Sequence, residues 1–190
     1  MPRYFLEVAY NGTRYSGFQK QLNANTVQAE VEKAFEILHR QPVDLTGSSR
    51  TDAGVHALQN YFHFDFDGVI HSQLIYKLNA ILPEDVVVKG VRLVADDAHC
   101  RFDARSREYH YRIFKVKNPF LKNFSFYFPY QLDMVALEHA ADIVKSKTDF
   151  SSFCKTNTQV KNFNCLIYKS QWKFEGEEIT YTIEGNRFLR

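Results

Sequence analysis

Residues 48–57 read Ser-Ser-Arg-Thr-Asp-Ala-Gly-Val-His-Ala and combine types of side chain that can carry out chemistry. They follow a short apolar run, residues 43–45, and precede a run with strand alternation, residues 60–66. Small residues on both sides favour a tight, exposed turn that presents the carboxylate of Asp52. Such a carboxylate can form a covalent adduct or stabilise charge that develops in a reaction. The same pattern also suits an Asx turn, in which the aspartate only bonds to its own backbone.

A second group of candidates lies in residues 101–122. Tyr109 and Tyr111 fall in a run with strand alternation, so they are expected to share one face of a strand. Ordinary packing of two aromatic rings on a sheet explains them equally well. The basic residues of this region are Arg101, Arg105, Arg107, Arg112, Lys115, Lys117 and Lys122, against Asp103 and Glu108. Basic residues interleaved with aromatics suit a phosphate backbone, although a solvated strand edge is the plain alternative.

Composition sets limits on the class of protein. With 190 residues, 45% hydrophobic and 24% charged, the chain can form one large globular domain or two small ones. The net charge of +2 is nearly neutral, so any nucleic-acid signal must come from local clustering. The cysteines Cys100, Cys154 and Cys165 match no disulfide framework, and the Cys and His spacings predict no metal site. Without a signal peptide or a membrane-spanning run, we expect a cytoplasmic protein with no membrane partner.

The first half is predicted to mix two helices with short strands. Residues 4–10 and 60–66 have strand patterns, and residues 86–94 are apolar enough for the centre of a sheet. Thr26 is expected to cap the first helix, and residues 72–82 form the second. Their apolar stripes are expected at Val27, Val31, Ala34 or Phe35, and Leu38, and at Leu74, Leu78 and Leu82.

The second half is predicted to repeat this scheme. Strands are expected at residues 108–117, 124–130, 165–174 and 178–184, the last two joined by a turn around Gly176. Asp133 can cap a helix whose apolar face would be Val135, Leu137, Ala140, Ala141 and Val144. We therefore expect an α+β protein with two halves, residues 1–100 with the Asp52 turn and residues 101–190. Each half would be a mostly antiparallel sheet with helices on one face.

Three segments carry a resemblance to a known family. Residues 50–57 resemble the catalytic motif of the TruA family of tRNA pseudouridine synthases. Residues 10–13 continuing through 17–21, and residues 101–111, fit the same family in the same order. The similarity extends along essentially the whole chain. It implies two ferredoxin-like halves around a central basic cleft, tRNA as partner, a homodimer, and no cofactor or metal.

The resemblance also implies an activity and roles for individual residues. Members isomerise uridine to pseudouridine at positions 38, 39 and 40 of the anticodon stem-loop, after flipping the base out of the stem. By family position Asp52 is the nucleophile, Tyr109 lies against the uracil, and Arg50 contacts the RNA or an orienting carboxylate. From the local charge, and not from the resemblance, Arg105 and Arg107 are expected to reach the RNA backbone, and Arg14, Lys20 and His56 to extend that surface.

The sequence departs from the family pattern at three places. Ser49 stands where a glycine usually precedes the arginine, and Phe18 where a tryptophan is common. Residues 184–190 resemble the start of the family's last motif, which normally continues through a Met-Val-Arg segment into a long helix. The basic residue expected to pair with Asp52 would lie beyond Arg190, so we expect a truncated or divergent short form.

Two other functions stay open from the sequence. A non-catalytic RNA-binding module would use the same surface, and only turnover separates it from an enzyme. A hydrolase or phosphotransferase with an aspartate nucleophile would need a companion carboxylate or a metal site near Asp52, which residues 50–57 do not supply.

Overall fold

The computed structural model describes residues 1–155 and 162–189. Its contacts divide the chain into two compact units, Met1–Asp103 and Ala104–Arg190, and each is described by itself. Both units are α+β with a mostly antiparallel four-stranded sheet, which confirms the predicted fold class. Within the described ranges, no helix combines the length and apolar character that crossing a bilayer requires. The basic cleft expected between the two halves stays a prediction.

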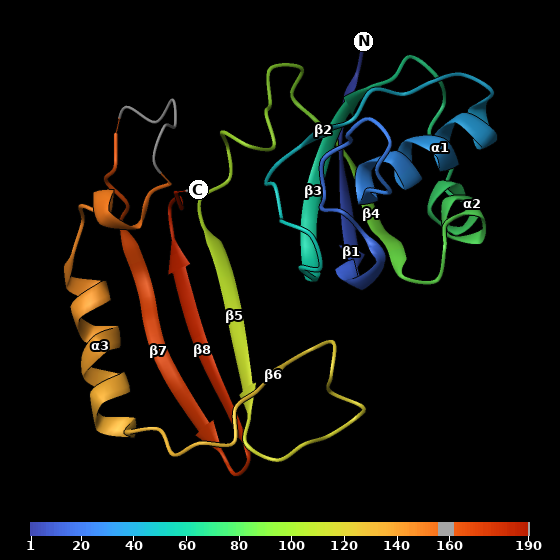
Figure 1. Ribbon diagram of the computed structural model, residues 1–190. Helices are drawn as coiled ribbons and strands as arrows, with labels where there is room; N and C mark the ends of the chain where they lie inside the picture. Colours follow the sequence, from blue (N-terminus) through green and yellow to red (C-terminus); the bar gives the residue numbers. More distant parts are fainter. Residues whose placement is uncertain (156–161, 190) are drawn as a thin grey trace. The chain divides into compact units, whose positions relative to one another are not determined.

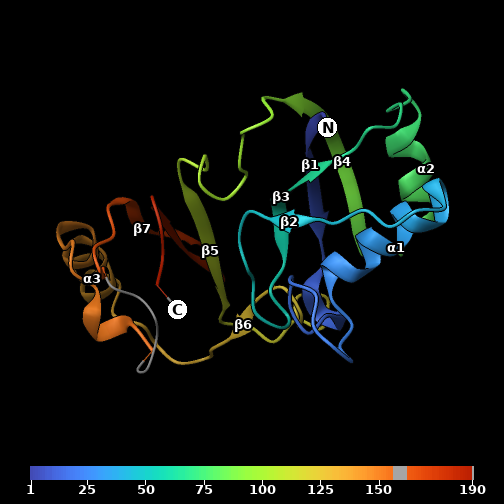
Figure 2. The ribbon, with the colours of Figure 1, turned by 90° about the horizontal axis from the view of Figure 1, so that it is seen from above.

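The first unit has the strand–helix–strand–strand–helix–strand order of a ferredoxin-like fold. Its elements are β1 (Arg3–Tyr10), the 3-10 helix η1 (Gly12–Arg14), α1 (Val27–His39), β2 (Thr46–Gly47), β3 (Ala57–Asp65), α2 (Leu74–Ile81) and β4 (Val86–Val94). The strands pair antiparallel in the order β2-β3-β1-β4. Helices α1 and α2 lie together on one face of this sheet (Figures 1 and 2). One sheet therefore carries the segment from β1 to α1, the segment from α1 to β2, and the turn before β3.

Helix α1 begins where the sequence predicts. The Thr26 side chain accepts a hydrogen bond from the amide of Ala29 at 3.4 Å, which satisfies one of the donors left open at a helix start. The helix ends at Arg40, whose φ of 55° is left-handed. Its apolar stripe is buried as expected: Val27, Val31, Ala34 and Phe35 lie in the core, and Leu38 packs against it.

The core of the first unit lies between the sheet and the two helices. Phe62, Phe64 and Phe66 follow the alternation of β3 and its end, and all three rings are buried. The stripe of α2 meets them with Leu74, Leu78 and Leu82, which are also buried. One expectation is wrong: β4 is an edge strand, not a central one. Its valines alternate, so that Val86 and Val88 face the core while Val87 is 41% exposed.

The second unit contains one α-helix among the residues described. Its elements are β5 (Arg107–Phe114), β6 (Phe126–Tyr127), α3 (Met134–Ser146), the 3-10 helix η2 (Ser151–Phe153), β7 (Ile167–Glu175) and β8 (Glu178–Gly185). The sheet order is β6-β5-β8-β7, antiparallel except for the short parallel pair of β5 and β6. The predicted turn at Gly176 joins β7 to β8 with a φ of 60°, which a glycine adopts without strain. The strand expected over residues 124–130 is only two residues long.

Helix α3 corrects one predicted face. Asp133 caps it as expected, because its side chain accepts from the amide of Ala136 at 3.0 Å. Leu137, Ala141 and Val144 are wholly or partly buried, whereas Val135 is 75% exposed and Ala140 is also exposed. At about 100° per residue, Val135 lies on the opposite side of the helix from Val144. The helical period therefore excludes it from the stripe that packs towards β7.

Candidate active site

The loop that carries Asp52, residues 48–57, joins β2 to β3 and presents its carboxylate to solvent. The amide of Val55 donates to the carbonyl of Asp52 at 3.3 Å, and Gly54 takes a φ of 78°. The turn is thus closed by the main chain. Among the described residues, the carboxylate of Asp52 forms no hydrogen bond, so the Asx-turn alternative gains no support.

Glycine at position 12 allows the Asp52 loop to approach β1 closely. A Cβ atom at Gly12 would lie 2.0 Å from the carbonyl oxygen of Val55, a distance that no side chain tolerates. In return, the amide of Gly12 donates to Nδ1 of His56 at 3.1 Å, which leaves the ring proton on Nε2 of the neutral imidazole. The two motifs that resemble the family therefore meet through direct contacts between their backbones.

Residues 15–18 hold the other side of the same loop. The amide of Phe18 donates to the carbonyl of Thr51 at 3.1 Å, and the amide of Gly54 donates to the carbonyl of Tyr15 at 3.2 Å. The Phe18 ring is buried and stacks on Phe62 with ring centroids 4.5 Å apart. These contacts fix the backbone on both sides of Asp52, while its side chain stays exposed.

A chain of polar side chains runs beneath the loop. The hydroxyls of Tyr10 and Thr51 lie 2.9 Å apart, and the side-chain nitrogen Nδ2 of Asn60 donates to Tyr10 Oη at 3.3 Å. The Ser49 hydroxyl donates to the side-chain oxygen of Asn60 at 3.0 Å, so the serine at this position has a defined partner. The sequence patterns described above do not mark Asn60 as a functional residue. Its signal was a polar residue in phase with the buried alternation of Phe62 on β3.

The predicted cationic residues of the first unit differ in their surroundings. Arg50 is exposed beside Asp52, and among the described residues it forms no ion pair or hydrogen bond. Arg14 instead pairs with Asp85 at 2.7 Å, and Lys20 pairs with Glu32 at 2.7 Å. Both side chains remain about three-fifths exposed, so their charges are partly compensated but still reach solvent.

Asp85 ties the segment after β1 to the start of β4. Its carboxylate accepts from Arg14 and from the hydroxyl of Tyr15 at 2.6 Å, and its carbonyl accepts from the amide of Asn11 at 2.8 Å. Burial alone would raise the pKa of Asp85, but the hydrogen bonds from Arg14 and Tyr15 outweigh it and lower the pKa. Burial, followed by the bond to Asp85, raises the pKa of Tyr15. The charge of Asp85 therefore stabilises the segment that supports the Asp52 loop.

In the second unit, Tyr109 lies on β5 opposite Ile183 of β8 and is 37% exposed. Tyr111 shares its face, as predicted from the alternation, and is 52% exposed. The rings of Tyr109 and Phe188 meet edge to face, with their centroids 5.1 Å apart and their planes at 85°. Arg107 donates to the carbonyl of Asn186 at 3.2 Å. Residues 186–188, part of the segment that resembles the family's last motif, therefore pack beside Tyr109; Arg190 lies outside the described residues.

The basic residues of the second unit are not equally available. Arg105 precedes β5 and is exposed, whereas Arg107 is partly buried by its contact with Asn186. Arg50 and Asp52 come together in one loop of the first unit, and Tyr109 and Arg107 on one strand of the second. The two groups belong to separate units.

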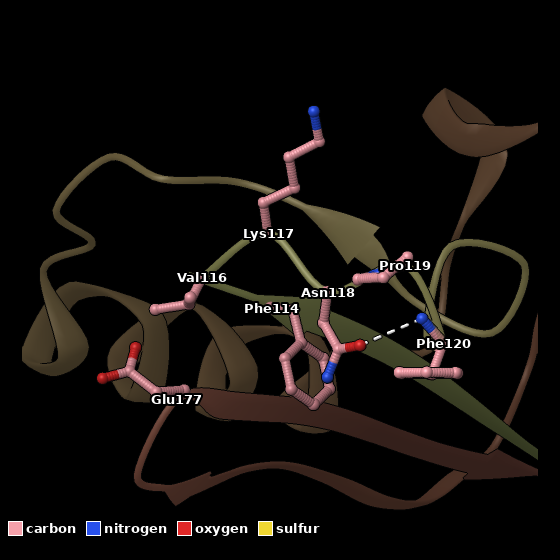
Figure 3. A pocket seen from close by; sticks show the side chains of 7 residues that line it. All are labelled: Phe114, Val116, Lys117, Asn118, Pro119, Phe120 and Glu177. Carbon is pink, nitrogen blue, oxygen red and sulfur yellow. Dashed lines mark hydrogen bonds between the residues drawn. The ribbon is translucent and has the colours of Figure 1, made fainter.

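A shallow hollow of about 390 Å³ lies at the far end of β5, and of the candidate residues only Lys117 lines it. Phe114, Val116, Pro119 and Phe120 give it a mainly apolar lining, with Lys117, Asn118 and Glu177 at its border. Figure 3 shows the Lys117 amine extending away from the two rings and the Asn118 side chain accepting from the amide of Phe120 at 2.9 Å. The hollow belongs to the second unit, whereas the Asp52 loop belongs to the first. Among the described residues, Asp52 also belongs to no group of three possible metal ligands, so the hydrolase alternative gains no support.

Comparison with known proteins identifies a family whose profile matches the part of the chain that holds the Asp52 loop. The sequence profile of a family described as tRNA pseudouridine synthase matches residues 7–103. A protein of Parabacteroides distasonis named tRNA pseudouridine synthase A is 42% identical over 193 residues, covering 100% of this chain and 76% of its own length. A protein of the same name from Porphyromonas gingivalis is 41% identical, covering 100% of this chain and 77% of its own length.

A more distant relative extends the comparison. The Staphylococcus aureus protein named tRNA pseudouridine synthase A is 37% identical over 98% of this chain and 72% of its own length. The matched profile includes both the Asp52 loop and the residues 12–18 that support it. With identities of this size along the whole chain, the chain belongs to the family of tRNA pseudouridine synthases, which are isomerases.

Proposed function

We propose that this chain isomerises uridine to pseudouridine in tRNA and that Asp52 is its nucleophile. The observation that carries the proposal is the exposed carboxylate of Asp52 on a loop whose backbone is fixed by Gly12, Phe18 and Tyr15. A nucleophile gains most when its position is set before the substrate arrives, because the reacting atoms then need little reordering. The exposed guanidinium of Arg50, two residues away, offers a cation for the RNA beside the same carboxylate.

The reaction would draw on two groups of this chain, Asp52 and Tyr109. The Asp52 carboxylate either forms a covalent adduct with the nucleoside or stabilises the charge that develops as the bond between N1 and the ribose breaks. The freed uracil turns, C5 bonds to the ribose carbon, and any Asp52 adduct is released. The proton on C5 is then lost and N1 gains one, so that the product is an isomer of the substrate. Tyr109 would stack on the base or carry that proton with its hydroxyl.

Binding of the RNA would rely on local positive charge. Extrusion of the target base costs a few kcal/mol, which contacts to the phosphate backbone must offset. Of Arg105 and Arg107, Arg105 is the exposed one, while Arg14 and Lys20 would contribute with their charges partly neutralised by Asp85 and Glu32. Uridines 38, 39 and 40 of the anticodon stem-loop are the proposed targets, on the strength of the family resemblance. A homodimer in the cytoplasm likewise stays a prediction.

The test is isomerisation by wild type and Asp52→Asn on an anticodon stem-loop RNA, measured as pseudouridine formed with enzyme in excess. The substitution removes the anion and keeps the shape, so we expect product to vanish while RNA affinity stays nearly unchanged. Asp67→Asn is a matched control, because Asp67 is also an exposed aspartate of the first unit, just after the end of β3. Product from Asp52→Asn at the wild-type rate would exclude the nucleophile role.

The alternative of a non-catalytic RNA-binding module makes a different prediction for the same assay. It requires that wild type binds the stem-loop and yet forms no pseudouridine in any of the uridines. Turnover by wild type that Asp67→Asn retains and Asp52→Asn lacks would support the enzyme and the nucleophile together.

A further inference from the structure

Three side chains that can bind metals converge in the first unit, and none of them belongs to the Asp52 loop. His63 comes from β3, while His99 and Cys100 belong to residues 95–103, which follow β4. One ligand atom from each lies within 4.8 Å of the other two. Their positions are too far apart in the sequence to form a recognisable metal motif, so only the fold brings them together.

The packing of β3 explains why this cluster forms. His63 alternates with Phe62 and Phe64, so its ring lies on the face of the sheet opposite the helices. It is nevertheless only 7% exposed, because residues 95–103 cover it. The His99 ring lies 4.5 Å from the His63 ring, and Cys100 Sγ lies 3.2 Å from His63 Nδ1.

The backbone that carries the second and third ligands is fixed by other contacts. Arg3 donates to the carbonyl of Ala98 at 3.0 Å, and Ser48 donates to the carbonyl of Cys100 at 2.8 Å. The amide of His99 donates to the Asp103 carboxylate at 2.7 Å. The ligand atoms therefore start near their final positions, which reduces the ordering that binding an ion would require.

We propose that His63, His99 and Cys100 form a binding site for a borderline-soft divalent metal ion of the Zn²⁺ class. Two imidazole nitrogens and one thiolate match the preference of Zn²⁺, and a water molecule would take the fourth position of a tetrahedron. In such a site the ligand atoms lie roughly 3.3–3.8 Å apart, given bond lengths of about 2.0–2.3 Å. The separations of up to 4.8 Å seen here would have to shorten by about 1 Å, through rotation of the side chains.

The electrostatic surroundings suit a dication. Burial, and after it the charges of His99 and Arg3, lower the pKa of His63. The charges of Asp65 and Asp103 act to raise the pKa of His63, and they add negative charge around the cluster. The Arg3 charge is itself paired with Asp65 at 2.7 Å.

The metal ion would have a structural role. It would fasten residues 95–103 to β3, at the point where the Cys100 carbonyl already holds Ser48. Ser48 is the first residue of the Asp52 loop, so the ion would stabilise the sheet that supports this loop without touching the reacting atoms. This inference does not depend on the proposed nucleophile.

Cobalt is a suitable probe because a thiolate bound to Co²⁺ gives a charge-transfer absorption that nitrogen ligands do not. The full chain, reduced and freed of metal with a chelator, is titrated with Co²⁺ and then with Zn²⁺ in competition. We expect a thiolate-to-cobalt band that saturates at a single equivalent and is displaced by Zn²⁺. Cys100→Ser should lose the band and bind Zn²⁺ at least about 10-fold more weakly. Cys165→Ser, a control at an equally buried cysteine of the second unit, should keep both.

Circular dichroism and thermal unfolding without metal separate loss of a ligand from loss of the fold. If Cys100→Ser does not fold, His99→Gln replaces it, since His99 is only partly buried, and it should weaken Zn²⁺ binding by a similar factor. The proposal is overturned if wild type gives no thiolate band, because His63 and Cys100 are then only a hydrogen-bonded pair. It is also overturned if Cys100→Ser, or His99→Gln in its place, binds Zn²⁺ as tightly as Cys165→Ser does.

Discussion

Gly12→Ala is the substitution that most directly tests how the Asp52 loop is positioned. The new Cβ would lie 2.0 Å from the carbonyl oxygen of Val55, whereas Cβ contacts under 3.0 Å are essentially never seen. The backbone on one side must therefore move by about 1 Å, since a carbonyl cannot rotate away as a flexible side chain can. The hydrogen bond from the Gly12 amide to His56 is strained by the same movement.

The expected loss follows from that displacement. A misplacement of about 1 Å in a reacting group costs about 10²-fold in rate, so pseudouridine formation should fall by about this factor. Crowding of the contact should also lower the free energy of unfolding by about 1–3 kcal/mol. Single-turnover assays on the anticodon stem-loop, at a temperature where thermal unfolding shows the variant to be folded, separate the two effects.

Gly90→Ala is the matched control. Its Cβ would meet only the Glu7 side chain at an ordinary 3.9 Å, so we expect a rate close to that of wild type. A folded Gly12→Ala variant that isomerises uridine as fast as Gly90→Ala would refute the reasoning. The close approach of the two backbones would then have no bearing on the position of Asp52.

Three further predictions concern charge and proton transfer. Burial acts to raise the pKa of Asp85, but the hydrogen bonds from Arg14 and Tyr15 outweigh it and lower this pKa in the folded state. The stability that the Asp85 charge contributes is therefore present above the unfolded pKa and is lost as pH falls through the folded pKa. Asp85→Asn should therefore cost about 1.5–3 kcal/mol at neutral pH and flatten the fall in Tm below about pH 4; an unchanged acid limb would contradict this. Arg105→Ala should reduce the slope of log affinity for RNA against log salt by about 0.7–0.9, and an unaltered slope would place the phosphate contact elsewhere. Tyr109→Phe keeps the ring and should slow isomerisation by roughly 10²–10⁴-fold with RNA affinity unchanged, whereas a near-normal single-turnover rate would exclude an essential hydroxyl.

Local patterns predicted those elements whose packing follows a single period. The cap at Thr26, the stripe of α1 and the buried alternation of Phe62 and Phe64 depend on neighbours a few residues away, and the structure confirms them. Patterns failed where a neighbouring element decided the outcome. The apolar run of β4 predicted a central strand, yet the order of pairing leaves it at the edge. The exposure of Val135 in α3 has a local cause: the residue is apolar, but the helical period places it outside the stripe.

The sequence alone determined the α+β class, the Asp52 motif and the family resemblance, because these depend on residue types in short order along the chain. Tertiary structure alone decided what supports the motif. The contact of Gly12 with Val55 and the bond between Ser49 and Asn60 join segments whose separation along the chain leaves no periodic signal. The same holds for His63 and Cys100, which no sequence pattern links. The sheet and the segment that covers it bring His63 Nδ1 and Cys100 Sγ to 3.2 Å. Pairing of strands brings such residues together, and its register is a property of the whole sheet.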